Sequence, residues 1–140
     1  MMYEPKEREQ RTNIQELKDD IQSNVINGDD FLQIALDGNK MIGYIRAERG
    51  QFNRISHTAY IVIGILKDYG RMGIGTAFFK DLDKWAKENG IIRLELTVEC
   101  HNIAAKNLYE KSGFEIEGIR RKSMHVGEEF VDEYYMAKIL

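Results

Sequence analysis

The first pattern along the chain is helical. Apolar residues recur every three or four positions at Ile14, Leu17, Ile21 and Val25, which is the spacing of one face of an amphipathic helix. Thr12 and Gln15 have the spacing of a capping box, and the pair at 27–28, Asn-Gly, is a stop signal. We therefore expect one amphipathic helix up to about residue 26, and poor order in the polar residues 1–11.

Strand patterns follow the helix. Apolar residues alternate over 32–36, an Asp-Gly-Asn turn follows, and 41–47 continues as a strand, which predicts a hairpin. Residues 59–66 are almost wholly apolar, as in a central strand buried on both faces. Further strands are expected at 91–98, 114–120 and 130–139, with the last two joined around Gly127.

Two more helical segments lie among these strands. An apolar stripe predicts a helix at 75–88 that ends at an Asn-Gly pair, and a second helix is expected at 102–111, ended by Gly113. The order is α, β, β, β, α, β, α, β, β, with no repeat and no linker. Residues 1–140 are therefore expected to form one domain of the mixed α/β class.

Composition narrows the possible functions. The net charge of −3 does not favour a sequence-independent nucleic-acid partner. No apolar run approaches the roughly 18 to 20 residues that span a bilayer. A single cysteine, Cys100, excludes an internal disulfide and favours a reducing compartment, so a cytoplasmic location is expected. The three histidines show no metal-ligand spacing, and no metal is expected.

The turn over residues 67–76 carries the candidate chemistry. It joins the buried strand to a helix start and contains Gly70, Gly73 and Gly75. Free N–H groups of such a turn and of the first helical turn form an anion site suited to a pyrophosphate, to which Arg71 can add a charged contact. The alternative, a tight strand-to-helix connection without a ligand, has about equal weight. A dinucleotide fingerprint would need glycine at Phe78, and a P-loop would need Lys-Ser or Lys-Thr after its last glycine, so both are excluded.

A second motif, Asn102-Ile-Ala-Ala-Lys-Asn-Leu-Tyr-Glu-Lys-Ser-Gly-Phe114, follows in the expected order. Together with the turn Gly70-Arg-Met-Gly-Ile-Gly75, it makes residues 31–140 resemble the GNAT superfamily of N-acetyltransferases. The segment from 117 to 136 is similar to a subgroup that includes amino-acid and protein N-terminal acetyltransferases. The resemblance implies a mostly antiparallel sheet flanked by helices. It also implies transfer of an acetyl group from acetyl-coenzyme A to a primary amine, by direct attack through a tetrahedral intermediate.

The resemblance also implies site residues. Backbone groups of Ile63 and Ile65 would bind the pantetheine arm, and the two strands ending near Ile65 and Val98 would splay apart around the thioester. The coenzyme loop would comprise Gly70, Arg71, Met72, Gly73, Ile74, Gly75 and Thr76. Asn102 would hydrogen-bond the pantetheine, and a plain helix N-cap is an equally weighted alternative.

The resemblance places the general acid at Tyr109, whose phenol would protonate the departing thiolate. The alternative is a tyrosine that only packs its ring. No general base is assigned, because Ala59 and Thr97 stand where family members carry a glutamate. Glu95 and Glu99 share a strand face with Thr97 and are weak candidates, since solvated strand carboxylates are the commoner case.

Departures from the family pattern leave alternatives open. Gly70 stands where Arg or Gln is usual, and only residues 1–11 precede the first helix, so the usual first strand is expected to be absent or irregular. The strand at 32–36 would then be a sheet edge, which a homodimer partner could cover unless the start codon is misassigned. A non-catalytic acyl-coenzyme A sensor is the alternative function. The acceptor is expected to be a small-molecule amine or a peptide N-terminus.

Overall fold

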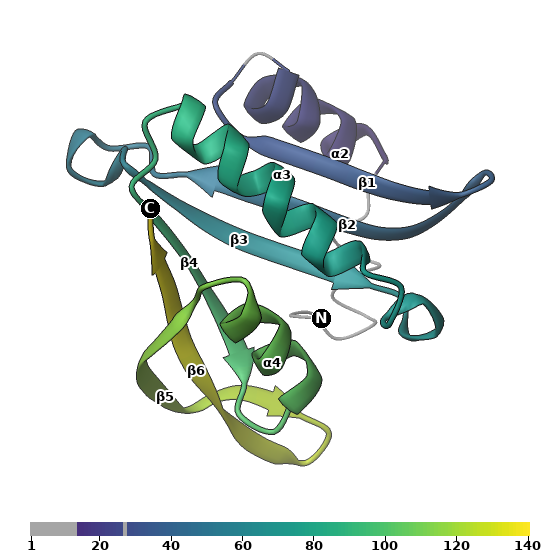
Figure 1. The fold of residues 1–140 in the computed structure, drawn as a ribbon, viewed down its shortest axis with the longest axis vertical. Coiled ribbons are helices and arrows are strands. Elements are labelled where there is room, and N and C mark those ends of the chain that lie inside the picture. Colours follow the sequence, from purple (N-terminus) through teal and green to yellow (C-terminus); the bar gives the residue numbers. More distant parts are fainter. Residues whose placement is uncertain (1–13, 27) are drawn as a thin grey trace.

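The computed structural model describes residues 14–26 and 28–140, which form a six-stranded sheet with helices on both faces (Figure 1). Its strands are β1 (Phe31–Asp37), β2 (Lys40–Arg49), β3 (Thr58–Ile65), β4 (Arg93–Glu99), β5 (Glu115–Val126) and β6 (Glu129–Ile139). Its helices are α2 (Ile14–Asp20), α3 (Ile74–Glu88) and α4 (Ile103–Lys111). Three expectations fall outside the described residues: the poor order of residues 1–11, the capping residue Thr12 and the stop signal at Asn27.

The strands lie in the order β1-β2-β3-β4-β6-β5. Only β3 and β4 pair in parallel, and every other neighbouring pair is antiparallel. This arrangement confirms the expected mixed, mostly antiparallel sheet. Within the described part of the chain, β1 is an edge strand, as expected for the segment around Leu32.

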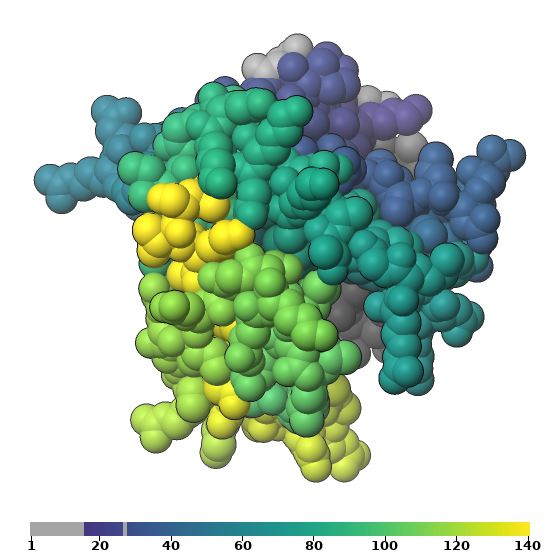
Figure 2. Space-filling view, viewed as in Figure 1, coloured from purple at the N-terminus to yellow at the C-terminus, as the bar shows by residue number. Residues whose placement is uncertain are grey.

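The core lies between the sheet and the pair of helices α3 and α4. Alternate residues of the central strands point to this side, and the largest fully buried side chains are Ile45, Leu82, Leu94, Leu96 and Met136. Burying one such side chain contributes about 1.5–3 kcal/mol to folding. Figure 1 shows α3 and α4 on this face and α2 behind the sheet. In the space-filling view, the part built from α4, β5 and β6 forms a lobe beside the part built from β1–β3 and α3 (Figure 2).

The two packed helices approach each other closely at Gly75. A Cβ atom there would lie 2.6 Å from Cδ2 of Leu108 in α4. A side chain at position 75 would therefore displace the side chain of Leu108. Gly73, just before α3, is constrained for a different reason, because its φ of +79° lies in the left-handed region.

The expected helix up to about residue 26 is confirmed, but only its first part is an α-helix. The α-helix ends at Asp20, and residues Ile21–Ile26 form a wider π-helical turn. Asp20 binds Arg46 of β2 at 2.6 Å and also accepts a hydrogen bond from Asn24. These contacts accompany the widened turn, and apolar periodicity cannot reveal them because Arg46 is far away in the sequence.

Candidate active site

The sheet opens between β3 and β4. The two strands pair only at Thr58↔Arg93, Ala59↔Leu94 and Tyr60↔Glu95, although both continue beyond these residues. Strand β4 pairs with β6 along its whole length and therefore follows β6 away from β3 (Figure 1). The expected splaying of the two strands is confirmed.

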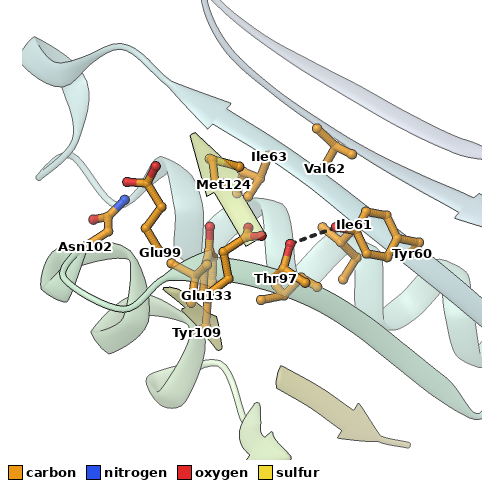
Figure 3. A pocket seen from close by; sticks show the side chains of 12 residues that line it. Tyr60, Ile61, Val62, Ile63, Thr97, Glu99, Asn102, Tyr109, Met124 and Glu133 are labelled. Atoms are coloured by element: carbon orange, nitrogen blue, oxygen red, sulfur yellow. Dashed lines mark hydrogen bonds between the residues drawn. The ribbon is translucent and has the colours of Figure 1, made fainter. Parts of the chain in front are cut away.

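A cavity of about 120 Å³ lies where the strands part. It is lined by Tyr60, Ile61, Val62, Ile63, Leu96, Thr97, Val98, Glu99, Asn102, Tyr109, Met124 and Glu133. These residues belong to both faces of the sheet: Ile61 and Leu96 face the helices, whereas Thr97 and Glu99 face the other side. We call this cavity the slot, because it connects the two faces. Tyr60 and Thr97 share a hydrogen bond of 2.9 Å (Figure 3).

One wall of the slot is an unpaired backbone edge. The N–H of Leu66 donates to the carbonyl of Ile42 in β2, and the register makes the even-numbered residues of β3 the ones that bond to β2. The N–H and C=O groups of Ile63 and Ile65 therefore point toward β4, which has already separated from β3. We predicted that the backbone groups of both residues bind the pantetheine arm. In the structure, these groups form no hydrogen bonds with β4. The side chain of Ile63 lines the slot, whereas Ile65 lies just beyond it.

Tyr109 reaches the slot from α4. Its ring packs edge-on against Phe79 and Phe114, with ring centroids 5.7 and 6.3 Å away, and the residue is only 8% exposed. The hydroxyl points into the slot (Figure 3), and no hydrogen bond holds it within residues 14–26 and 28–140. Burial, helped by the electrostatic influence of Tyr60, raises the pKa of Tyr109 to about 12. The phenol therefore stays protonated at any ordinary pH.

Asn102 caps the start of helix α4 and lies at the slot. Its side-chain oxygen accepts a hydrogen bond of 3.2 Å from the N–H of Ala105, so the N-cap interpretation is confirmed. The same residue lines the slot. Its amide nitrogen thus remains available for a second contact.

The glycine-rich loop lies at the start of α3, outside the group of residues that line the slot. No side chain caps the first turn of α3, because Gly73 holds the N-cap position. Gly70 has an ordinary φ of −66°, so the backbone there does not require glycine. Arg71, Met72 and Thr76 are exposed, while Ile74 is half-buried against the core.

The two carboxylates considered as bases have different environments. Glu99 lines the slot. Glu95 lies outside it and binds the guanidinium of Arg93 at 2.9 Å. Ala59, one of the positions where the family carries a glutamate, is fully buried in the core.

Glu133 is a charged slot residue that sequence reasoning missed. It is 4% exposed, and its Oε1 accepts a hydrogen bond of 2.9 Å from Ser123. The guanidinium of Arg120 lies 3.6 Å from the same oxygen. In the sequence, Glu133 is marked only as a glutamate between aromatic residues of a strand. Its position at the slot follows from the pairing of β4 with β6, which places Glu133 opposite Glu99.

None of the described helices is long and apolar enough to cross a membrane. Residues 14–26 and 28–140 contain no group of three His, Cys, Asp or Glu side chains arranged to hold a metal ion.

Comparison with known proteins gives a consistent result. The sequence profile of the Acetyltransferase (GNAT) family matches residues 2–114. The L-amino acid N-acetyltransferase AaaT of Escherichia coli K12 is 33% identical over 112 residues, which cover 77% of this chain and 67% of that protein.

Among solved structures, the crystal structure of a GNAT-family acetyltransferase from Streptococcus pneumoniae is similar, with a TM-score of 0.78 and 32% identity. The match covers 89% of this chain and 74% of that one. The ribosomal-protein-S18-alanine N-acetyltransferase of Escherichia coli is similar with a TM-score of 0.68 and 26% identity, over 79% of this chain and 68% of that one.

Proposed function

This chain belongs to the GNAT family of acetyl-CoA-dependent N-acetyltransferases, and we propose that it acetylates the α-amino group of an amino acid or of a peptide N-terminus. The observation that carries this proposal is the slot, which passes through the sheet. A thioester approaching from the helix face and an amine approaching from the opposite face would meet inside it. The proton donor Tyr109 reaches the slot from α4, and the two carboxylates lie on the opposite face.

The residues of the helix face fit the coenzyme. The uncapped first turn of α3 and the loop 70–76 offer backbone N–H groups to a pyrophosphate. A Cβ atom at Gly73 would meet nothing within 4 Å, so the loop is open to an approaching ligand at that point. The unpaired edge at Ile63 and Ile65 would bond the pantetheine arm as a neighbouring strand would, and Asn102 would add its free amide N–H groups.

The same residues suggest how the reaction proceeds. Backbone N–H groups of β3 would stabilise the oxyanion that forms when a neutral amine attacks the thioester carbonyl. Tyr109 would donate its proton to the departing sulfur, which its raised pKa allows because the phenol is always protonated. Apolar residues such as Ile61, Leu96 and Val98 line part of the slot and would keep water from the thioester.

A second hollow supports an amino acid as acceptor. It measures about 400 Å³, lies on the α2 side of the sheet and shares Tyr60 with the slot. Carboxylates and guanidinium groups both line it, among them Asp30, Glu48, Arg46 and Arg49. Arg46 is ion-paired there with Asp20 and Asp30, so Arg49 is the guanidinium group open to the carboxylate of an amino acid. The amino-acid relative AaaT points to the same class of acceptor.

The test has a binding step and a turnover step. Acetyl-CoA at about 100 times its dissociation constant should stabilise the protein by roughly 2.7 kcal/mol and raise the unfolding midpoint by several degrees, whereas ATP and NAD should not. A panel of L-amino acids and alanyl peptides is then assayed by release of the coenzyme thiol. Stabilisation without turnover of any amine would support the sensor alternative instead.

A variant tests the role of Tyr109 in the same assay. Tyr109→Phe should lower kcat by about 10² to 10⁴-fold, the usual contribution of a general acid, and leave the stabilisation by acetyl-CoA unchanged. An unchanged kcat would leave Tyr109 only its packing role.

A further inference from the structure

The slot carries two adjacent carboxylates. Among the described residues that line it, Glu99 and Glu133 are the only ones with charged side chains. They are register partners on β4 and β6, so their Cβ atoms are neighbours at about 4.5–5.5 Å. An ammonium group that entered from this face would meet both of them.

We propose that Glu133 binds the ammonium group of the acceptor and removes its proton, and is therefore the general base. This proposal rests on the acetyltransferase function proposed above. Glu133 would supply the general base that is missing at Ala59 and Thr97, whose side chains cannot accept the proton.

The contacts of Glu133 favour it over Glu99. Ser123 and Arg120 both contact Oε1 of Glu133, and no hydrogen bond from the described residues reaches Oε2. One oxygen is thus held in place while the other is free to accept a proton. The Glu133 side chain is 5% exposed against 27% for Glu99, and the latter lies 3.8 Å from the exposed ring of His101. A buried carboxylate attracts an ammonium group more strongly, because water screens it less.

A local irregularity of β5 holds this arrangement. The pairing of β5 with β6 shifts between Arg120 and Met124, and Lys122 in the bulge has a φ of +51°, which is rare for a residue with a side chain. The N–H of Lys122 donates to Asp132 at 2.8 Å and fixes the bulge. The bulge lets Ser123 reach Glu133. Strained backbone of this kind persists where the surrounding structure holds it, and it is common at active sites.

The acceptor ammonium group loses two protons during the reaction, and the leaving sulfur gains one. Oε2 of Glu133 takes one proton from the ammonium group, and the neutral amine forms the C–N bond with the acetyl carbon. The C–S bond breaks, and Tyr109 gives its proton to the leaving sulfur. The new amide nitrogen loses its second proton, which restores the phenol directly or through solvent. Glu133 then releases the first proton to solvent on the open face.

Two amino acids of the same skeleton separate proton removal from other roles. The amino group of L-alanine is protonated at neutral pH, whereas that of 3,3,3-trifluoroalanine is largely neutral because its fluorines withdraw electrons. Glu133→Gln should lower kcat/KM for alanine by about 10² to 10⁴-fold, and that for trifluoroalanine by less than about tenfold. With alanine, kcat/KM of this variant should rise about tenfold per pH unit as the amine loses its proton, while the wild type stays flat.

The controls are two other carboxylate-to-amide changes. Glu129→Gln alters the same face of the same strand at an exposed position outside the slot and should behave as the wild type. Glu99→Gln tests the competing base. The titratable and charged groups that face Glu133 are retained in Glu133→Gln: Arg120 from β5, Glu99 from β4, Cys100 just after β4, Tyr60 from β3 and Tyr109 from α4.

The outcomes are distinct. Two results with Glu133→Gln would overturn the proposal: an equal loss of kcat/KM on both amino acids, or a kcat/KM that does not change with pH. A pH-dependent kcat/KM in Glu99→Gln, and not in Glu133→Gln, would also overturn it. Stabilisation by acetyl-CoA shows that Glu133→Gln is folded. A wild type that binds acetyl-CoA but turns over no amine would refute the proposed function, and the role of Glu133 with it.

Discussion

The buried phenol of Tyr109 should make the protein less stable at alkaline pH. Its pKa is about 12 in the folded chain, against an ordinary value of 10.0. Burial disfavours the charged phenolate, so the folded state holds the proton more tightly than the unfolded state does. The stability is therefore intact below pH 10 and is lost as the pH rises through 12.

The magnitude follows from the size of the shift. Two pKa units at about 1.4 kcal/mol each correspond to a loss of about 3 kcal/mol above pH 12. At about pH 11 the unfolded phenol is mostly ionised while the folded one is not, so roughly half of the loss, about 1.4 kcal/mol, is already present. Replacing Tyr109 by Phe removes this contribution and leaves the ring packing against Phe79 and Phe114 in place.

Urea unfolding at several pH values measures the effect. The free energy of unfolding of wild type minus that of Tyr109→Phe should be constant from about pH 7 to 9 and should then fall by about 1.4 kcal/mol at about pH 11. The other tyrosines and the lysines are common to both proteins and cancel in the difference. A difference that stays constant up to pH 11 would refute the reasoning, because it would mean that the phenol is not desolvated.

Two further predictions concern packing and charge. Gly75→Ala should cost about 1 kcal/mol, because its Cβ would lie 2.6 Å from Leu108, while the better helix propensity of alanine offsets part of the clash. Thermal unfolding of the double variant with Leu108→Ala should show less than the sum of the single losses. Additive losses would mean that α3 and α4 do not pack at this point. Arg46→Met should cost about 1–3 kcal/mol at pH 7, because it removes the ion pairs with Asp20 and Asp30. The cost is below that of a fully buried pair, because the side chain of Asp20 is 40% exposed. The hydrogen bond from Arg46 lowers the pKa of Asp20, so the stability it contributes is present above the ordinary carboxyl pKa and disappears as the pH falls. In urea unfolding, the difference between Arg46→Met and wild type should therefore shrink toward about pH 3, and a pH-independent difference would contradict the role of this ion pair.

The order of helices and strands was predictable because local patterns determine it. Period-two alternation located β1, the turn after it located β2, a nearly continuous apolar run located β3, and helical periodicity located α3. The N-cap at Asn102 and the loop before α3 were also visible, since a cap acts within three residues of itself. The resemblance of these two motifs to the GNAT family then indicated the chemistry, and the family is confirmed.

Contacts between distant residues were not predictable in this way. The π-helical turn accompanies the contact of Asp20 with Arg46, and the close approach at Gly75 depends on Leu108. The side chain of Glu133 looks like an ordinary strand carboxylate until its register opposite Glu99 is known. A single sequence carries no pattern that marks such pairs, because each partner is compatible with many others.

The sequence by itself therefore determined the elements, the family and the residues of two local motifs, Tyr109 among them. The tertiary structure decided where β3 and β4 part, which backbone edge this leaves open at Ile63 and Ile65, and which carboxylates face the slot. The physical reason is the distance along the chain over which each kind of interaction acts. Helix periodicity, caps and turns arise from interactions over a few residues, whereas a site that passes through a sheet depends on strand pairing between segments far apart in the chain.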